Sequence, residues 1–225
     1  MCARFSLASP ERVVDRYPQF KLRRSWPPRY NVAPTDDVLA VRNDAEGEIA
    51  PLRWGLVPPW ARNLSVGATM INARAETLAE KPAFRDALVH RRCLIFADGF
   101  YEWAGPKQRR LPYRFTRDGG APFAFAGLWE RWGPQDARVE SCTIVTCPPN
   151  ALLEPFHDRM PVILDDDAFE TWLHGELAEA VSTLVPYDTA RMQSAAVTPA
   201  MNRVTFDDPR AIEPLGEDLS VRLFE

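Results

Sequence analysis

The chain has 225 residues, 46% of them hydrophobic and 26% charged, a composition that fits one sizeable globular domain or two small ones. The formal net charge of −4 argues against a generic polyanion binder, although a local basic groove is compatible with it because binding depends on how charge is distributed. No apolar run approaches the roughly 18–20 residues that cross a membrane, and the amino terminus lacks a secretory pattern, so no membrane partner is expected.

Short apolar runs, turn residues and prolines predict a succession of short strands with a few helices. In chain order we expect a strand over residues 2–7, a helix over 9–16, a long surface loop over 18–34, strands over 38–41 and 49–54, a rigid aromatic stretch over 54–60, a helix over 82–91, strands over 93–97, 99–103, 111–117, 122–129 and 139–147, helices over 168–173 and 176–184, and a last strand over 192–197.

Individual residues support several of these boundaries. Ser9 and Pro10 have the pattern of an N-cap followed by a proline in the first helical turn. The predicted loop over 18–34 is rich in proline, and Gly47 indicates a turn between two strands. Many short strands with separate helices indicate an α+β fold around an antiparallel sheet, and no repeat or linker divides it. We therefore expect a single domain over residues 1–225.

The four cysteines, Cys2, Cys93, Cys142 and Cys147, have neither CxxC spacing nor the density of a disulfide scaffold. Free thiols and a cytoplasmic location are therefore expected, with no metal and no cofactor. A zinc site built from Cys93, Cys142, Cys147 and a histidine is a remote alternative, because only Cys142 and Cys147 are close in sequence and both lie in a predicted strand.

Cys2 has a chemistry that no internal cysteine shares. If Met1 is removed, Cys2 carries an amine and a thiol on adjacent carbons, and this pair can condense with an aldehyde to an imine and then close a thiazolidine ring. Reference pKa values of about 7.7–8.0 for the α-amine and about 8.5 for the thiol leave reactive amine near pH 7. A chance cysteine on a frayed terminus is the alternative.

Glu102 lies within an aromatic strand, where alternation places it on the same face as Phe100. A carboxylate on an apolar face is costly to bury as a charge, so its pKa should be raised, as suits a general acid or base. The alternative is that this face is exposed to solvent at a sheet edge.

His157 and Asn72 are polar residues next to apolar segments. His157 lies in a proline-bounded loop and can act as a proton shuttle near neutral pH, or it can be a surface histidine paired with Asp158. Asn72 can orient a reacting group by donating and accepting hydrogen bonds, or it can simply cap the following turn. His90 and His174 are interpreted as structural or surface residues.

Three arginines accompany these candidates at a spacing of two residues. Arg4 lies two residues after Cys2, Arg74 two after Asn72 and Arg159 two after His157. In an extended segment, side chains two residues apart point to the same side. Guanidinium groups in this arrangement suit a site that faces a phosphate backbone, although ordinary solvated arginines are the alternative. Tryptophans such as Trp54, Trp60 and Trp103 could stack on bases or pack in the core.

Most of these residues lie in six segments that occur in a fixed order. The segments are residues 1–5 (MCARF), 31–35 (NVAPT), 53–58 (RWGLVP), 72–76 (NARAE), 99–103 (GFYEW) and 157–161 (HDRMP). Together they resemble the SOS-response-associated peptidase (SRAP) family, which shields abasic sites in single-stranded DNA. The resemblance covers residues 2–200.

The resemblance implies a single SRAP-type α+β domain with an antiparallel, barrel-like sheet, peripheral helices and a basic DNA groove. It implies that Met1 is removed and that the protein binds single-stranded DNA containing abasic sites, and we expect a monomer. The implied catalytic residues are Cys2 as the covalent nucleophile, Asn72 as the positioning amide, Glu102 as the proton relay and His157 as the group that assists imine chemistry; the implied DNA-binding residues are Arg4, Pro34, Thr35, Arg74, Trp103 and Arg159. One departure is Ala3, where the family usually has glycine, and its methyl group is expected to narrow the backbone path beside the site or to forbid a positive φ there.

These parts predict a thiazolidine crosslink between Cys2 and the ring-opened abasic sugar, with autoproteolytic removal of Met1 and weak strand cleavage from the imine stage. Two rivals belong to other classes. An N-terminal-nucleophile amidohydrolase would use the amine of Cys2 as the base for its own thiolate. A non-catalytic single-strand binder would show salt-sensitive binding that denaturation reverses.

Overall fold

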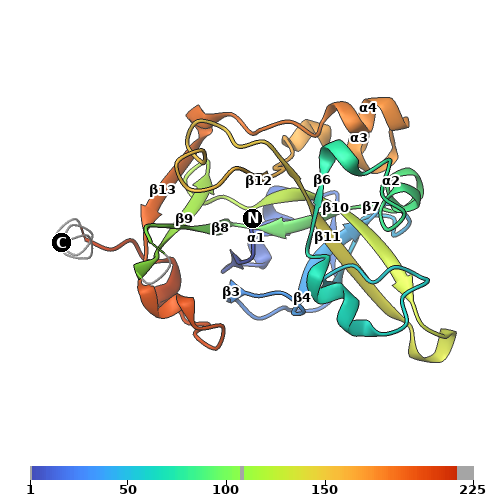
Figure 1. Cartoon of the computed structure of the whole chain (residues 1–225), viewed down its shortest axis with the longest axis horizontal. Helices are drawn as coiled ribbons and strands as arrows, with labels where there is room; N and C mark the ends of the chain where they lie inside the picture. Colours follow the sequence, from blue (N-terminus) through green and yellow to red (C-terminus); the bar gives the residue numbers. More distant parts are fainter. Residues whose placement is uncertain (1, 107–108, 217–225) are drawn as a thin grey trace.

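The computed structural model describes residues 2–106 and 109–216 (Figure 1). The described strands are β1 (Phe5–Leu7), β2 (Lys21–Leu22), β3 (Arg29–Val32), β4 (Asp37–Arg42), β5 (Glu48–Trp54), β6 (Asn72–Arg74), β7 (Arg92–Ala97), β8 (Gly99–Ala104), β9 (Leu111–Arg117), β10 (Phe123–Trp132), β11 (Val139–Cys147), β12 (Met160–Pro161) and β13 (Met192–Ala196). The described helices and 3-10 turns are α1 (Glu11–Arg16), α2 (Arg85–His90), α3 (Phe169–His174), α4 (Leu177–Ser182), η1 (Leu64–Thr69), η2 (Ala75–Thr77), η4 (Gln135–Ala137), η5 (Asp166–Ala168), η6 (Thr189–Arg191), η7 (Pro199–Asn202) and η8 (Pro209–Ile212).

The larger sheet closes on itself as a five-stranded barrel. Its strands follow the order β11-β10-β7-β4-β5, and β5 returns to pair with β11. The pairs along the path are antiparallel, whereas the closing pair is parallel and joins Arg53 to Ser141 and Trp54 to Cys142. Closure leaves none of these five strands with a free edge at the closing point. The barrel is therefore mixed rather than wholly antiparallel.

The second sheet has five strands in the order β13-β9-β8-β1-β3, all antiparallel. Figure 1 shows β8, β9 and β13 on one side of the molecule, with β10, β11 and helices α2 to α4 on the other. Aromatic rings join the two sheets, because Phe5 of β1 lies 5.0 Å from Trp54 and 5.8 Å from Phe125 between ring centroids. β1, which begins three residues after Cys2, is thus fixed against both sheets.

The predicted α+β fold is confirmed, and each expected strand and helix is present within a few residues of its predicted bounds. The helix expected over 9–16 begins at Glu11, and Pro10, rather than Ser9, occupies the N-cap without a side-chain capping bond. Among the described residues, no helix is long and apolar enough to cross a membrane.

The prediction of one long surface loop over residues 18–34 is wrong. This segment contains β2 and β3, and β3 pairs with β1 through Phe5 and Val32. Asn31 is only 1% exposed, because its side-chain amide donates hydrogen bonds to the backbone carbonyls of Met201, Arg203 and Phe206. Prolines outside the strands gave the segment a loop-like composition although tertiary pairing orders it.

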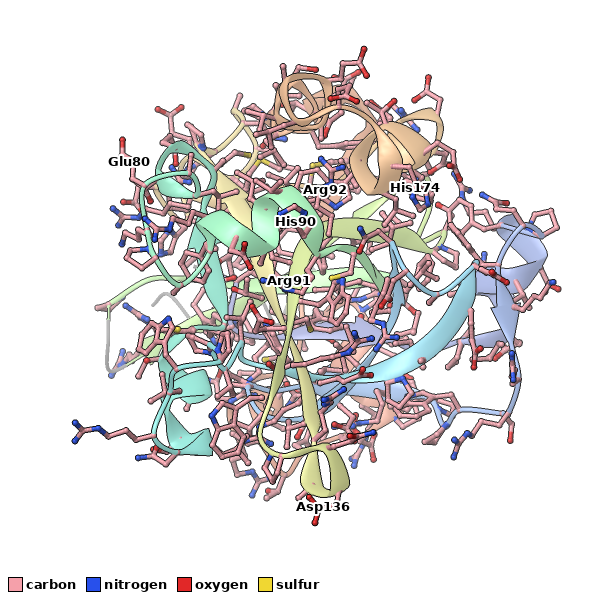
Figure 2. All side chains as sticks on the ribbon, turned by 90° about the vertical axis from the view of Figure 1, so that its right-hand side faces the viewer. Glu80, His90, Arg91, Arg92, Asp136 and His174 are labelled. Carbon is pink, nitrogen blue, oxygen red and sulfur yellow. The ribbon has the colours of Figure 1, made fainter. Side chains whose placement is uncertain are left out.

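His90 and His174 end helices α2 and α3 and are exposed on the face that Figure 2 presents to the viewer. Next to them, Arg92 donates to the carbonyls of Leu173 and Gly175 at the end of α3. Basic side chains at helix carboxyl ends are stabilising because they complement the helix dipole. The structural or surface interpretation of both histidines agrees with this placement.

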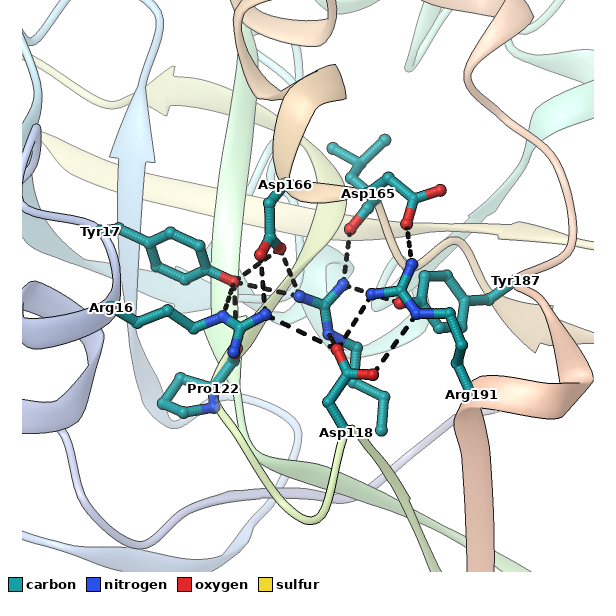
Figure 3. A network of polar contacts seen from close by, with 10 residues as sticks. Arg16, Tyr17, Asp118, Pro122, Asp165, Asp166, Tyr187 and Arg191 are labelled. Atoms are coloured by element: carbon teal, nitrogen blue, oxygen red, sulfur yellow. Dashed lines mark hydrogen bonds and ion pairs between the residues drawn. The ribbon is translucent and has the colours of Figure 1, made fainter.

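A network of arginines and aspartates joins elements far apart in the sequence (Figure 3). At its centre Arg117 is fully buried and donates to Asp166, to the carbonyl of Leu164 and to the hydroxyl of Tyr187. Arg191 joins the same network at its exposed side through Asp118 and Asp165. The network ties β9 to η5 and η6.

Replacing Arg117 with methionine should lower the free energy of unfolding by about 3 kcal/mol, because the change removes the buried cation that pairs with Asp166. Urea denaturation at pH 7 measures this loss. Arg191→Met is the matched control in the same network, and because Arg191 is exposed it should cost less than about 1 kcal/mol. Equal losses for the two variants would contradict this account of the network.

Candidate functional site

Cys2 lies three residues before the start of β1 and has no exposed surface. Its Sγ is 3.6 Å from the carbonyl oxygen of Arg4, to which it donates a weak hydrogen bond. Burial raises the pKa of the Cys2 thiol well above its usual range, and the charge of Glu102 acts in the same direction. The sulfur is therefore held as a protonated thiol within the electrostatic reach of Glu102. Met1, whose removal the sequence predicts, lies outside the described residues.

Asn72 meets Cys2 from the opposite sheet. Its Nδ2 donates to the carbonyl oxygen of Cys2 at 2.8 Å, while its Oδ1 is buried and accepts no hydrogen bond from any described residue. A buried acceptor without a donor is costly, and such groups are candidates for contact with a ligand or reactant. The amide thus has one fixed hydrogen bond and one acceptor that is available beside Cys2.

The backbone before Asn72 is held by tight packing. Gly55 has a φ of +125°, and a Cβ at this position would lie 2.5 Å from the carbonyl oxygen of Gly67. This close approach allows residues 55–70 to fold back, and the indole of Trp54 donates to the carbonyl of Ile71 at 2.9 Å. β6 then pairs in parallel with β11, which places Asn72 opposite Ile144.

Glu102 lies in β8 opposite Tyr113 of β9 and is 4% exposed. Burial raises the pKa of Glu102 to about 7. The negative charge of Asp158 acts in the same direction, and the positive charge of Arg110 opposes it. The alternative of a solvent-exposed face is wrong, because Glu102 and Phe100 are both buried. A carboxyl group with this pKa can donate or accept a proton near neutral pH.

His157 lies in the segment between β11 and β12. Its Nδ1 is 2.7 Å from Asp158 Oδ1 and accepts a hydrogen bond from the backbone N–H of Arg159 at 3.0 Å. Burial lowers the pKa of His157, and the positive charges of Arg110 and Arg159 act in the same direction, while Asp158 opposes them. His157 thus contacts Asp158, as the surface-histidine alternative predicts, but its ring is partly buried and its lowered pKa favours the neutral form.

The three predicted phosphate-binding arginines differ in their surroundings. Arg4 Nη1 donates to Asn31 Oδ1 at 2.9 Å and to the carbonyl of Met201 at 3.3 Å. Arg159 is 9% exposed and forms a two-pronged ion pair with Glu76, with N–O distances of 2.6 and 2.8 Å. Arg74 is exposed and forms no ion pair within residues 2–106 and 109–216. Only Arg74 of the three therefore has an uncommitted guanidinium.

The other predicted groove residues lie on separate strands and turns. Trp103 is half-buried at the end of β8, and its Nε1 donates to Asn202 Oδ1 at 2.6 Å. Pro34 and Thr35 follow β3, and Thr35 has a φ of +77°, which is strained for a β-branched residue. Arg53 Nη1 donates to the carbonyl of Thr35 at 2.7 Å and holds this conformation. Strain of this kind is concentrated at functional sites.

Thr35→Gly should raise the free energy of unfolding by about 1 kcal/mol, because glycine removes the strain of a positive φ but loses more backbone entropy on folding. It should also weaken DNA binding, because the predicted groove loses a side chain. Glu46→Gly is the matched control, because Glu46 has a φ of +46° in the turn between β4 and β5. This change should raise the free energy of unfolding without affecting DNA binding. Urea denaturation and fluorescence anisotropy measure the two effects, and a Thr35→Gly protein less stable than wild type would contradict the strain argument.

Sequence reasoning missed three residues that the structure places at the site. Asn31 was noted only as part of a segment, yet it binds Arg4 and three carbonyls of the carboxyl-terminal part. Asn202 contacts Trp103, and Arg110 shifts the pKa values of Glu102 and His157. The sequence contains no local signal for these contacts, because each joins residues at least 27 positions apart or acts through space.

The four cysteines are all buried and free of disulfides, as expected. Within the described part of the chain, no group of three or more histidine, cysteine or acidic side chains could hold a metal ion. The structure instead brings together Cys2, Asn72 and Glu102, a buried cysteine with an amide hydrogen-bonded to its carbonyl and a carboxyl group whose charge acts on its thiol.

Comparison with known proteins assigns the chain to one family. The chain belongs to the family described as SOS response associated peptidase (SRAP), whose sequence model matches residues 1–204. It is 43% identical over 223 residues to abasic site processing protein YoqW of Bacillus subtilis (strain 168), covering 95% of this chain and 99% of that protein. It is 30% identical to abasic site processing protein HMCES of Mus musculus, covering 95% and 76%. A crystal structure of a Bacteroides thetaiotaomicron protein superposes with a TM-score of 0.86 at 26% identity, covering 96% and 100%.

Proposed function

We propose that the protein processes abasic sites in single-stranded DNA by forming a covalent thiazolidine between Cys2 and the ring-opened deoxyribose. The observation that carries this proposal is the convergence of three groups: Asn72 donates to the carbonyl of Cys2, and the charge of Glu102 acts on the Cys2 thiol. The names of the relatives YoqW and HMCES, both abasic site processing proteins, support the choice of substrate.

The reaction needs an unblocked amine, so removal of Met1 comes first. The amine nitrogen of Cys2 then attacks C1′ of the sugar aldehyde, and the aldehyde oxygen becomes a hydroxyl group. Loss of this hydroxyl as water gives the imine. The sulfur adds to the imine carbon, and its proton goes to the nitrogen. Two bonds join protein and DNA at the end, and one water has left.

Glu102 is the proton relay in this scheme. It accepts a proton from the attacking amine and returns it to the departing hydroxyl, and a pKa of about 7 suits both directions. Asn72 positions the reactants, because its Oδ1 is a buried acceptor beside Cys2. His157, held neutral by burial, assists the imine steps and the reversal of the crosslink.

The imine is also the branch point to strand cleavage. From this intermediate, β-elimination would break the bond to the 3′ phosphate and release the strand end. Ring closure by the adjacent sulfur competes with elimination because it is intramolecular. We therefore propose that lyase activity is weak, and that the peptidase activity in the family name acts on the bond between Met1 and Cys2.

The DNA would lie against Arg74, Trp103 and the Pro34–Thr35 turn. Arg74 supplies a charge that no described acidic group neutralises as an ion pair, and Trp103 offers a partly exposed indole on which a base can stack. Arg4 and Arg159 would keep their hydrogen bonds within the protein and would add positive charge beneath these surface residues.

Denaturing electrophoresis tests the proposal. The protein is mixed with three single strands: one with a natural abasic site, one with a tetrahydrofuran analogue that has no aldehyde, and one undamaged. A species that survives boiling in detergent is expected only with the natural abasic site. Complexes that dissociate completely on denaturation would favour a non-catalytic binder. Turnover of glutamine or acyl amides without a DNA adduct would favour the amidohydrolase.

A further inference from the structure

The proposed DNA surface has fewer available cations than the sequence suggested. Arg4 is committed to Asn31 and Met201, and Arg159 is committed to Glu76 and to the carbonyl of Thr146 at 2.5 Å. A phosphate contact by either would have to share a guanidinium that already has partners, and Arg159 is also buried. A strand bound at Cys2 therefore lacks available cations other than Arg74 among the three arginines that the sequence suggested.

The turn η7 contacts the backbone of a second exposed arginine, Arg110. Asn202 accepts a hydrogen bond from Trp103 Nε1 at 2.6 Å, and its Nδ2 donates to the carbonyl oxygen of Arg110 at 3.4 Å. The register of β8 and β9 pairs Trp103 with Pro112 and Ala104 with Leu111, so Arg110 immediately precedes the end of this ladder. One amide thus fixes the indole of Trp103 and the backbone of Arg110 next to each other.

η7 is itself held in place. Its residue Met201 accepts hydrogen bonds through its carbonyl from Arg4 and Asn31, and its side chain packs with Tyr101 in a small apolar cluster. The hydroxyl of Tyr101 donates to the carbonyl of Tyr30 at 2.6 Å. Asn202 is therefore presented by a rigid support rather than by a free loop.

The side chain of Arg110 is exposed and forms no ion pair within the described residues. Its charge nevertheless lowers the pKa of both Glu102 and His157, which places it within electrostatic reach of two groups of the site. An exposed arginine whose backbone is fixed by the same amide as an indole suits the combination of phosphate contact and base stacking that single-strand binders use.

We propose that Arg110 is a phosphate-binding residue of the DNA site and that Asn202 positions it beside Trp103. Arg74 at the end of β6 and Arg110 immediately before β9 then supply two separate cations for the backbone of a single strand whose abasic nucleotide is bound at Cys2. This inference rests on the proposed function for the identity of the ligand.

The test measures binding without chemistry, using a fluorescent single strand that carries the tetrahydrofuran analogue. Loss of one phosphate contact on a single strand should reduce the slope of log K against log salt by about 0.7 and weaken binding about fivefold at 0.1 M salt. Arg110→Gln is expected to show both changes, and Arg110→Lys should restore the slope because it restores the charge. Arg109→Gln, at the neighbouring exposed arginine, is the matched control and should leave both values unchanged.

Asn202→Ala tests the positioning role. On its own it should reduce the salt slope, and in the Arg110→Gln background it should reduce the slope no further, because the two residues act through one contact. An unchanged slope in Arg110→Gln, or an equal loss in Arg109→Gln, would overturn the proposal. If the wild-type protein binds the analogue but forms no adduct with a natural abasic site, the proposed function fails while the slopes still decide the role of Arg110.

Discussion

Cys2→Ser is expected to abolish the denaturation-stable adduct with abasic DNA while leaving an amine that forms the imine. The hydroxyl of serine is a far weaker nucleophile than a thiol, so the five-membered ring does not close to a stable product. Electrophoresis after boiling should show no adduct above background. The same reaction with borohydride present should trap the imine as a stable amine, which locates the defect at the second bond.

The Cys2→Ser experiment needs proof that Met1 has been removed, because a blocked amine would give the same negative result. Intact mass measurement of the variant supplies this control. Cys147→Ser is a matched substitution at another buried cysteine that is not part of the proposed mechanism, and it should form the adduct normally if the protein folds. An adduct from Cys2→Ser as abundant and heat-stable as that of wild type would rule out the thiazolidine.

Glu102→Gln should slow adduct formation by about 10²–10⁴-fold, the usual contribution of a positioned general acid–base group. The wild-type rate should rise with pH through an inflection near 7, because the ionised carboxylate accepts the proton of the amine. The variant should lose this inflection and follow the amine alone, with an apparent pKa of about 7.7–8.0. If Glu102→Gln kept the wild-type dependence of rate on pH, the inflection near 7 would belong to a group other than Glu102.

The same residue predicts how stability depends on pH. The pKa of Glu102 is raised from 4.5 in the unfolded chain to about 7 in the folded protein, so the protonated form is favoured by folding. Its stabilising contribution is complete below pH 4.5 and is lost as the pH rises through 7. Glu102→Gln, which cannot ionise, should therefore be more stable than wild type at pH 8 by up to about 3 kcal/mol. Urea denaturation at pH 5 and pH 8 measures this difference, and an equal stability of the two proteins at pH 8 would contradict the raised pKa.

Much of the fold could be predicted from local patterns. Strands β7 and β10 contain continuous apolar runs, residues 93–97 and 123–129, and α2 has an apolar face that its spacing reveals. The barrel was implied only by the family resemblance and could not be predicted from local patterns, because the parallel pair between β5 and β11 that closes it joins residues 88 positions apart. β3 was missed for a related reason: only its pairing with β1 distinguishes it from a proline-rich loop.

The site could be predicted in part. The burial of Glu102 followed from strand alternation, and the proximity of Asn72 to Cys2 agrees with the family resemblance. The pairing of Arg159 with Glu76 could not be foreseen, because spacing shows the side to which an arginine points but not the acid that faces it from another segment. The position of Arg110 likewise depends on η7, almost one hundred residues further along the chain.

Intact mass spectrometry of the protein after incubation with a single strand bearing one abasic site tests the central claim most directly. The account predicts a species with the mass of the protein lacking Met1 plus that of the oligonucleotide less one water, because imine formation releases water and ring closure releases nothing. A protein that retains Met1, or that lacks Met1 and leaves the abasic strand unmodified, would contradict the account.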